Sequence, residues 1–384
     1  MHGHFDELIV ISILTLMLCG SFANTASASS VQIWYSLDNM YYNSEMSYRD
    51  VEFLNGTHGF VAGVTTEGIG GGVILATNDS GDSWFEVYHD TNQTFRQISI
   101  VNQSTIWVTG RGRLVYTTNG GQNWQNSCTI GSGTSGLSAV AFINNTHGWT
   151  STNDILYATR DSGLTWLAVE SWKYNDTSRD FYINASNIWI IGYYGIYYSS
   201  DLGDTWSQQF NYGGWALSFV DSHTAWAIAD NMLAYSADGL NWNTLTPPRP
   251  SPLGGFNPPY FSDILFLTSS VGWIVGLETP VAFTPNGGLD WFTQNVETDA
   301  RMNAIEFINE TYGWMVGAKG TIMRTQKGNL YGERLWKGLT DHVIVLPIVI
   351  AFIGITSLFM IRRHVRKSRV LPNQSQGPTS IEPA

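Results

Sequence analysis

A six-residue motif that recurs about every forty residues constrains this chain more than any other feature. It reads Asp-x-Gly-x-x-Trp, with Asn replacing Asp in some copies and one copy a residue short. A Ser or Thr stands two positions before each copy, and successive hydroxyl residues lie 40, 42, 40, 37, 48 and 41 residues apart. These positions are Thr77, Thr117, Thr159, Ser199, Ser236, Thr284 and Thr325, the last opening a decayed seventh copy. Such a period is typical of solenoids and propellers.

We call each copy a box and predict that it is a tight turn. Six boxes keep the Trp; their first and last residues are Asp79 and Trp84, Asn119 and Trp124, Asp161 and Trp166, Asp201 and Trp206, Asp238 and Trp242, and Asn286 and Trp291. An Asp or Asn side chain accepts hydrogen bonds from nearby N–H groups, and Gly supplies a positive φ. The Ser or Thr hydroxyl bonds across the turn, and the Trp packs beneath it with its N–H satisfied. The acidic groups are therefore expected to be structural.

Alternating apolar segments surround every box. An apolar strand ending at Asn or Asp comes first (51–55 is VEFLN), and a strand centred on an aromatic residue follows, such as Trp107 or Trp314. A third short strand leads into the box, and the box Trp opens a fourth. Four strands in about forty residues are typical of a propeller blade. The sequence predicts an all-β, seven-bladed propeller over residues 31–327.

The seventh repeat lacks a fourth strand, and residues 32–35 around Trp34 have the pattern that would supply it. Pairing of the two ends would close the ring and leave no open edge. Six box tryptophans, six in second strands and Trp34 make up 13 of the 16 tryptophans. We therefore expect the tryptophans to form the blade core.

Both ends of the chain carry membrane signals. Residues 8–20 are apolar and precede Ala-Ser-Ala at 26–28, which predicts a cleaved signal peptide over 1–28. Residues 343–361 are uncharged and long enough for one transmembrane helix, and a basic cluster follows. The expected order is signal peptide, propeller, stalk (328–342), helix (343–361) and cytoplasmic tail (362–384). This arrangement predicts a single-pass protein of the cell membrane with an extracellular propeller.

Charge and cysteine content exclude several classes of protein. The net charge is -12, which argues against a nucleic-acid partner. The two cysteines, Cys19 and Cys128, cannot make a disulfide framework or a cysteine-rich zinc site. No motif predicts a metal or a cofactor. His58, His147 and His223 occupy the same turn in three repeats, which favours surface turn residues over a shared metal site.

The spacing of Asp, Gly and Trp in the boxes resembles the Asp-box, or BNR-repeat, propellers. Within that class, the Gly-Trp-x-Val-Gly strands at 272–276 and 313–317 look like photosystem II stability/assembly-factor-like proteins. The resemblance implies a seven-bladed, non-enzymatic propeller that binds other proteins. Sialidases and sortilin-type receptors also carry Asp-boxes.

A carbohydrate-active hydrolase or glycan-binding propeller of the sialidase type is the alternative. A sialidase-like site needs an early Arg in an Arg-Ile-Pro context, which is absent. A glycosidase needs two carboxylates about 5–9.5 Å apart. The candidate carboxylates show no pairing signature; they are Asp50, Asp180, Asp263, Glu278 and Asp299. We therefore expect no catalytic residues.

Blade topology predicts two different faces. Boxes and first hairpins share one face, where five Asn-x-Ser/Thr acceptors are expected: Asn55, Asn102, Asn144, Asn184 and Asn309. Two more, Asn92 and Asn175, lie in connections between blades. These acceptors suit a glycosylated extracellular surface.

The opposite, loop-rich face is the expected binding face. Its loops offer Arg111, Arg113, Tyr193, Tyr194, Trp172, Trp215 and Tyr260. Arg49, Arg96, Arg179 and Arg301 precede first strands and are expected to ring the mouth of the central channel. Exposed aromatics and Arg are typical of interface hot spots. The sequence thus predicts a membrane-anchored, non-enzymatic scaffold that docks a protein or glycan on this face.

Overall fold

A computed structural model describes residues 33–37, 45–65, 71–133, 135–229, 232–247, 260–277, 281–294 and 296–329. The chain divides into two compact units, 1–330 and 331–384, and every described residue belongs to the first. The predicted signal peptide, transmembrane helix and cytoplasmic tail lie outside the described residues, as does the stalk beyond Asn329. Within those described ranges, no helix is long and apolar enough to cross a membrane.

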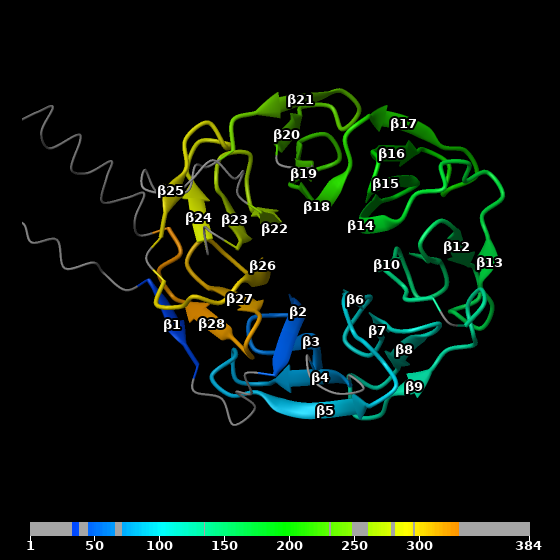
Figure 1. The fold of residues 1–384 in the computed structure, drawn as a ribbon, viewed down its shortest axis with the longest axis horizontal. Helices are drawn as coiled ribbons and strands as arrows, with labels where there is room; N and C mark the ends of the chain where they lie inside the picture. The colour runs from blue at the N-terminus through cyan, green and yellow to red at the C-terminus, as the bar shows by residue number, and fades with distance from the viewer. Residues whose placement is uncertain are drawn as a thin grey trace, which may run out of the picture. The chain divides into compact units, whose positions relative to one another are not determined.

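Seven four-stranded antiparallel sheets surround a common axis (Figure 1), which confirms the seven-bladed propeller. Blades 1 and 2 are β2 (Met46–Phe53), β3 (Gly59–Thr65), β4 (Gly72–Thr77) and β5 (Phe85–Asp90), then β6 (Ile98–Ile100), β7 (Ile106–Thr109), β8 (Leu114–Thr117) and β9 (Gln125–Asn126). Blades 3 and 4 are β10 (Val140–Phe142), β11 (Gly148–Ser151), β12 (Leu156–Thr159) and β13 (Leu167–Ala168), then β14 (Ser178–Asn184), β15 (Asn187–Gly192), β16 (Ile196–Ser199) and β17 (Ser207–Phe210). Each blade runs outward from its first strand.

The remaining blades follow the same order, except at the closure. Blades 5 and 6 are β18 (Gly214–Phe219), β19 (Ala225–Ala229), β20 (Met232–Ser236) and β21 (Trp242–Leu245), then β22 (Phe261–Phe266), β23 (Gly272–Gly276), β24 (Val281–Thr284) and β25 (Phe292–Thr293). Blade 7 combines β26 (Met302–Phe307), β27 (Gly313–Gly317) and β28 (Ile322–Thr325) with β1 (Trp34–Ser36) from the other end of the chain.

The predicted closure is confirmed in its register. Trp34 lies opposite Thr325 in the antiparallel pair of β1 and β28. Its ring is fully buried, and its Nε1 donates to Oε1 of Gln294 at 2.8 Å. The Trp34 ring also meets Phe307 edge to face at 5.7 Å. The chain ends are therefore joined by a core contact as well as by strand pairing.

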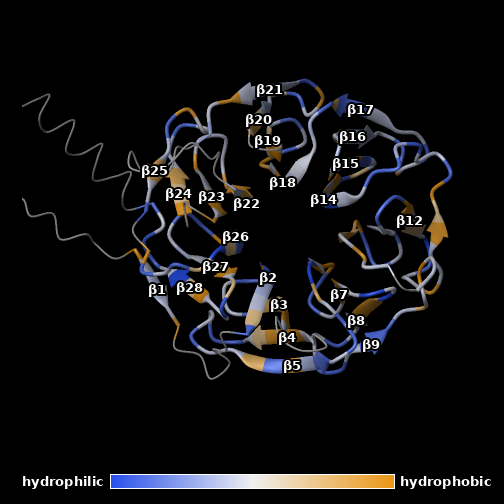
Figure 2. Ribbon diagram, in the orientation of Figure 1, coloured by the Kyte–Doolittle hydropathy of each residue, from blue (hydrophilic) through white to orange (hydrophobic). Residues whose placement is uncertain are grey.

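The core lies between neighbouring blades. Strands such as β4 and β24 carry the apolar colour in Figure 2, whereas β9 and β17 at the circumference are hydrophilic. All six second-strand tryptophans are buried: Trp107, Trp149, Trp189, Trp226, Trp273 and Trp314. The prediction that these tryptophans form the core is confirmed.

The boxes are held by the turn chemistry that the sequence predicts. In blade 1, Thr77 Oγ1 donates to Oδ1 of Asp79 at 2.8 Å and accepts the N–H of Gly81 at 2.9 Å. Oδ1 of Asp79 also accepts the N–H of Ser83 at 2.9 Å. Gly81 has the expected positive φ of 75°, and Ser80 before it has one of 63°. Non-glycine residues take this left-handed position in two more boxes, at Ser162 and Leu202.

The prediction that every box Trp satisfies its N–H is wrong. Trp206 and Trp291 donate to the carbonyls of Gly203 and Gly288 at 3.0 and 3.1 Å. The other four indole N–H groups have no partner among the described atoms; they belong to Trp84, Trp124, Trp166 and Trp242. Burial of an indole contributes roughly 4–6 kcal/mol, which outweighs the loss of about 1–3 kcal/mol from one unmade hydrogen bond.

In blades 4, 5 and 7 the second-strand tryptophan donates a hydrogen bond to the box of the next blade. Trp189 Nε1 donates to the carbonyl of Gly239 at 2.7 Å, and Trp226 Nε1 donates to that of Gly287 at 3.0 Å. At the closure of the ring, Trp314 Nε1 donates to Ser80 at 3.2 Å, and a Cβ on Gly81 would collide with the same indole. The box glycine is therefore required for close packing as well as for the turn.

We expect Trp34→Ala to lower the free energy of unfolding by about 3–5 kcal/mol, because it leaves a cavity where the ends of the ring meet. Tyr35→Ala, on the same strand but 42% exposed, is the matched control and should cost less than about 1 kcal/mol. Denaturant titration of both variants measures the difference. Equal losses would show that the core contact of Trp34 does not stabilise the closure.

Candidate functional site

Strand order fixes what lies on each face of the propeller. Because the four strands of a blade are antiparallel, boxes and first hairpins project from one face. The hairpins between second and third strands, and the connections between blades, project from the loop-rich face. Each first strand starts at the loop-rich face beside the axis. Residues near the start of a first strand can therefore meet there from blades far apart in sequence.

β-Bulges reshape the starts of five first strands. The pairing register shifts at these points and leaves one extra residue in each: Arg49, Arg179, Trp215, Ser262 and Asn303. A bulge bends the strand locally and changes the direction of the extra side chain. The same irregularity thus delivers two arginines and a tryptophan to the inner edge of the loop-rich face.

We call Arg49, Arg96, Arg179 and Arg301 the arginine group, because each of them interacts electrostatically with at least one of the others. Burial, then Arg96 and Arg301, lowers the pKa of Arg49. Burial and Arg96 likewise lower the pKa of Arg179. These arginines are close enough to repel one another, within a chain whose net charge is -12. This part of the loop-rich face is a basic site on an acidic protein.

Two aromatic rings hold Arg179. Its guanidinium carbon lies 4.2 Å from the ring centre of Trp215 and 5.7 Å from that of Tyr193. Tyr193 is 56% exposed and Trp215 38% exposed, and Tyr194 lies edge to face with Tyr193 at 5.1 Å. We call these four residues the aromatic patch. A stacked guanidinium keeps its N–H groups in a fixed plane, suited to a carboxylate.

Other predicted binding residues lie elsewhere. The placement of Trp172 on the surface is wrong: it is 8% exposed and packs edge to face on Trp206, because the connection from blade 3 inserts it between two blades. Arg111 pairs with Gly136 in an isolated bridge, and the charge of Arg113 acts on Tyr88 near outer strand β5. Tyr260 is exposed beside the second hairpin of blade 6, where its carbonyl accepts the N–H of Leu277.

Sequence reasoning missed Asp176, the charged residue that is fully buried in the connection between blades 3 and 4. Its carboxylate accepts the N–H groups of Tyr193 and Tyr194. The surrounding Asn-Asp-Thr has the composition of an exposed turn, so no local signal marked the residue as buried.

Beneath the arginine group, four polar side chains tie the first strands together. Asp50 Oδ2 accepts the N–H of Ile98 in the next blade at 2.7 Å, and its Oδ1 accepts that of Val51 at 2.8 Å. Asp180 and Asp263 repeat this bridge, and Gln97 Oε1 accepts the N–H of Val140 at 2.8 Å. Both oxygens of each aspartate are committed to the main chain, which argues against a glycosidase role.

The remaining carboxylates and histidines do not form a site. Asp299 pairs with Lys319 at 2.7 Å, and Glu278 lies outside the described residues. His58, His147 and His223 each bond the hydroxyl beside them in separate hairpins. Across the described ranges, no group of three His, Cys, Asp or Glu side chains suits a metal ion.

The predicted acceptors for glycans lie in turns and loops. Oδ1 of Asn55, Asn144 and Asn309 accepts N–H groups within its own hairpin. Oδ1 of Asn102 does the same, and its Nδ2 also donates to Oδ1 of Asn145. Asn184 ends β14. Asn92 and Asn175 are exposed in connections between blades. Attachment of glycans stays a prediction.

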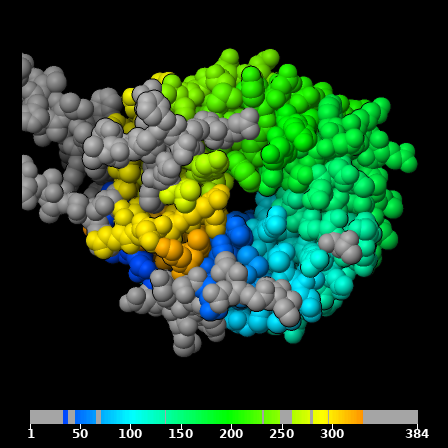
Figure 3. All heavy atoms as spheres, viewed as in Figure 1, coloured from blue at the N-terminus to red at the C-terminus, as the bar shows by residue number. Residues whose placement is uncertain are grey.

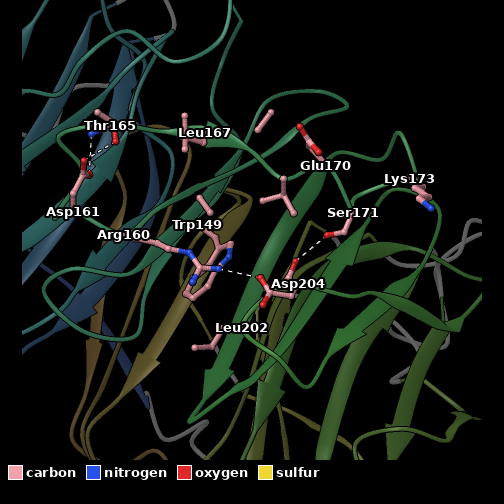
Figure 4. Close-up of a pocket in the computed structure, with 14 residues that line it drawn as sticks. Trp149, Arg160, Asp161, Thr165, Leu167, Glu170, Ser171, Lys173, Leu202 and Asp204 are labelled. Atoms are coloured by element: carbon pink, nitrogen blue, oxygen red, sulfur yellow. Dashed lines mark hydrogen bonds and ion pairs between the residues drawn. The ribbon is translucent and has the colours of Figure 1, made fainter.

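A groove of about 640 Å³ opens between blades 3 and 4 (Figure 4). Trp149, Leu167 and Leu202 line it, and the ion pair of Arg160 with Asp204, at 3.1 Å, crosses it. Figure 3 shows blades 2 to 5, cyan to green, as one continuous surface around the axis. The groove contains none of the clustered arginines and has cations and carboxylates side by side. It is therefore a weaker candidate than the arginine group.

The fold and the repeated boxes define an Asp-box β-propeller. The family described as "Photosynthesis system II assembly factor YCF48" matches residues 26–130. The photosystem II assembly lipoprotein Ycf48 of Synechococcus sp. (strain CC9902) is 22% identical over 339 residues, covering 83% of this chain and 96% of that relative. The resemblance to photosystem II assembly-factor-like propellers is thereby confirmed.

Solved structures agree on the fold. A YCF48 structure bound to a D1 peptide has a TM-score of 0.60 and 20% identity, covering 77% of this chain and 97% of that one. YCF48 from Cyanidioschyzon merolae has a TM-score of 0.60 and 17% identity, covering 77% and 99%. Virginiamycin B lyase from Staphylococcus aureus has a TM-score of 0.61 and 12% identity, and the match covers 76% of this chain and 98% of that one. At these identities the likeness shows the fold alone.

Three carboxyl groups on first strands, those of Asp50 and Glu52 on β2 and of Glu306 on β26, predict a free energy of unfolding that falls as pH rises. Burial, then the charge of Asp50, raises the pKa of Glu52 to about 8, and burial raises that of Asp50 to about 6. Burial, then Glu52, raises the pKa of Glu306 well above its usual range. A group whose pKa is raised in the folded state stabilises it below the unfolded pKa, and this contribution is lost as pH rises through the folded pKa.

We therefore expect the wild-type free energy of unfolding to be lower at pH 8.5 than at pH 5.5. Glu306→Gln, which stays neutral, should remove part of that fall, on the order of 1–3 kcal/mol. Glu86→Gln on exposed outer strand β5 is the matched control. Denaturant titrations at both pH values measure the effect, and a Glu306→Gln curve parallel to wild type would contradict it.

Proposed function

We propose that this protein is a non-enzymatic scaffold that docks an acidic segment of another protein on its loop-rich face. The arginine group would attract the segment, and the aromatic patch would anchor it. The observation that carries the proposal is the placement of Arg179, 4.2 Å from the ring centre of Trp215 and electrostatically coupled to Arg96. Clustered cations speed association, and desolvated Arg and aromatic residues hold a partner.

The geometry suits a carboxylate better than a neutral group. A guanidinium presents N–H donors in a rigid fork that matches the two oxygens of a carboxylate. Burial and then repulsion between neighbouring arginines lower the pKa values of Arg49 and Arg179, and an anion that binds there relieves the repulsion. An acidic segment would therefore gain more at this site than elsewhere on a surface of net charge -12.

The comparisons support a protein partner. One similar propeller has been solved with a D1 peptide bound, and a similar relative is an assembly lipoprotein of photosystem II. We infer that this chain also binds a peptide segment, and the arginine group indicates that this segment is acidic.

We also propose that the propeller lies outside the cell, held by one transmembrane helix at 343–361. The uncharged stretch and the basic residues from Arg362 onward support this topology. The glycan acceptors on the box face suit the same location and would leave the loop-rich face open to the partner.

We expect a fluorescent hexaglutamate peptide to bind the full chain, and Arg179→Ala to weaken that binding about ten-fold or more, because charge-assisted hydrogen bonds to a carboxylate are lost. Arg160→Ala, which removes an exposed arginine at the groove of blades 3 and 4, is the matched control. Fluorescence anisotropy measures both. Equal binding of hexaglutamine, or equal weakening by the two variants, would refute docking at this site.

We expect the full chain to remain in the membrane pellet after alkaline carbonate extraction, since a spanning helix resists it. A chain that stops after residue 342 should move to the soluble fraction. Immunoblots of both fractions provide the measurement. Release of the full chain would contradict the anchor.

A further inference from the structure

We propose that Asp176 is a positioning residue of the docking face: its buried carboxylate holds the hairpin corner of Tyr193 and Tyr194 and thereby presents Arg179 in its stacked position. The inference rests on the proposed function, because it assigns to the aromatic patch a residue that the partner never touches. Three sets of contacts support it.

The carboxylate of Asp176 organises the corner directly. Oδ1 accepts the N–H of Tyr193 at 2.7 Å, and Oδ2 accepts that of Tyr194 at 2.8 Å. Oδ2 also accepts the hydroxyl of Tyr197 at 2.7 Å. Asp176 is fully buried, so these three donors replace water around the charge. Two consecutive backbone N–H groups bound to one carboxylate fix the local path of the hairpin.

Two glycines show how closely the corner is enclosed. A Cβ on Gly192 would collide with Oδ2 of Asp176, and a Cβ on Gly213 would collide with the backbone of Tyr193. Gly213 directly precedes β18, whose bulge carries Trp215. The Tyr193 corner is therefore wedged between Asp176 and the strand that bears the other ring beside Arg179.

The charge of Asp176 also acts on Arg179. Its carboxylate opposes the lowering of the pKa of Arg179 that burial and Arg96 produce. Burial and the bond to Asp176 raise the pKa of Tyr197, so that phenol stays protonated as a donor. Asp176 thus fixes one ring beside Arg179 and partly balances the charge of the guanidinium.

Blade 2 has a neutral version of the same arrangement, which supplies a control. Gln93 lies four residues before Gln97, as Asp176 lies four before Asp180. Oε1 of Gln93 accepts the N–H of Arg111 at 2.6 Å, and a Cβ on Gly110 would come within 2.5 Å of that oxygen. The Arg111 corner belongs to blade 2, whereas Arg179 and Trp215 belong to blades 4 and 5. Loss of the hydrogen bond between Gln93 and Arg111 should therefore not affect docking at Arg179.

A rigid corner matters because binding otherwise has to order the side chains that make contact. Exposed tyrosines on a free hairpin would lose conformational freedom when a partner docks, and that loss weakens affinity. With the corner already held, less freedom is lost on binding. Removing one acceptor oxygen from Asp176 should therefore weaken binding through Arg179, although Asp176 does not contact the partner.

The test compares Asp176→Asn with Gln93→Ala in the full chain, using the hexaglutamate probe. We expect Asp176→Asn to weaken binding about ten-fold and to accelerate hydrogen exchange of the amides in 192–195, while Gln93→Ala leaves both unchanged. In an Arg179→Ala background, Asp176→Asn should have little further effect, since both act through one group. The inference would be overturned if Asp176→Asn weakened binding just as much in the Arg179→Ala background, or if it left hydrogen exchange at 192–195 unchanged.

Two further outcomes keep this test separate from that of the proposed function. If wild type fails to bind the probe, the proposed function fails, and exchange at 192–195 alone decides whether Asp176 holds the corner. If Asp176→Asn does not fold, Tyr197→Phe replaces it, because it removes one bond to the same carboxylate. That variant should weaken binding about three-fold, and unchanged binding and exchange would refute the positioning role.

Discussion

The contact between an aromatic ring in the second strand of one blade and a box glycine in the next blade underlies the rest of the structure. It recurs around the ring: Phe60 meets Gly121, Trp107 meets Gly163, Trp149 meets Gly203, Trp189 meets Gly239, Trp226 meets Gly287, Trp273 meets Gly328 and Trp314 meets Gly81. At Gly81 and Gly163 only glycine allows both the positive φ and the close approach of the indole. A short motif that looks like turn chemistry is therefore also the joint between blades.

A second set of joints lies at the axis. Asp50, Asp180 and Asp263 each accept one N–H in their own blade and one in the next, which makes six bonds. Gln97 accepts the N–H of Val140, which is the seventh. Each of the seven first strands thus has the equivalent N–H bonded, by four side chains in all. Burial of these carboxyls is costly, since it raises their pKa values. The gain is a rigid inner ring on which the arginine group is mounted.

The division between rigid frame and variable loops explains how one fold serves unrelated roles. Propellers similar in shape to this one include both YCF48 and a lyase, so the frame does not decide chemistry. Function has to be sought in side chains that the frame does not need. The arginine group fits that description, because like charges held together weaken the fold and require another reason to exist.

The sequence by itself determined the number of blades, the pairing of the chain ends through Trp34 and the hydrogen bonds of the boxes, because a repeated local pattern specifies each of them. Only the tertiary structure decided that Trp172 is buried, that Arg179 lies over the ring of Trp215 and near that of Tyr193, and that Asp176 holds a neighbouring hairpin. These features depend on bulges and on contacts between blades, where residues meet that are distant in sequence and follow no period. A local sequence pattern specifies the blade that repeats. The candidate site departs from that pattern, because it depends on packing between blades.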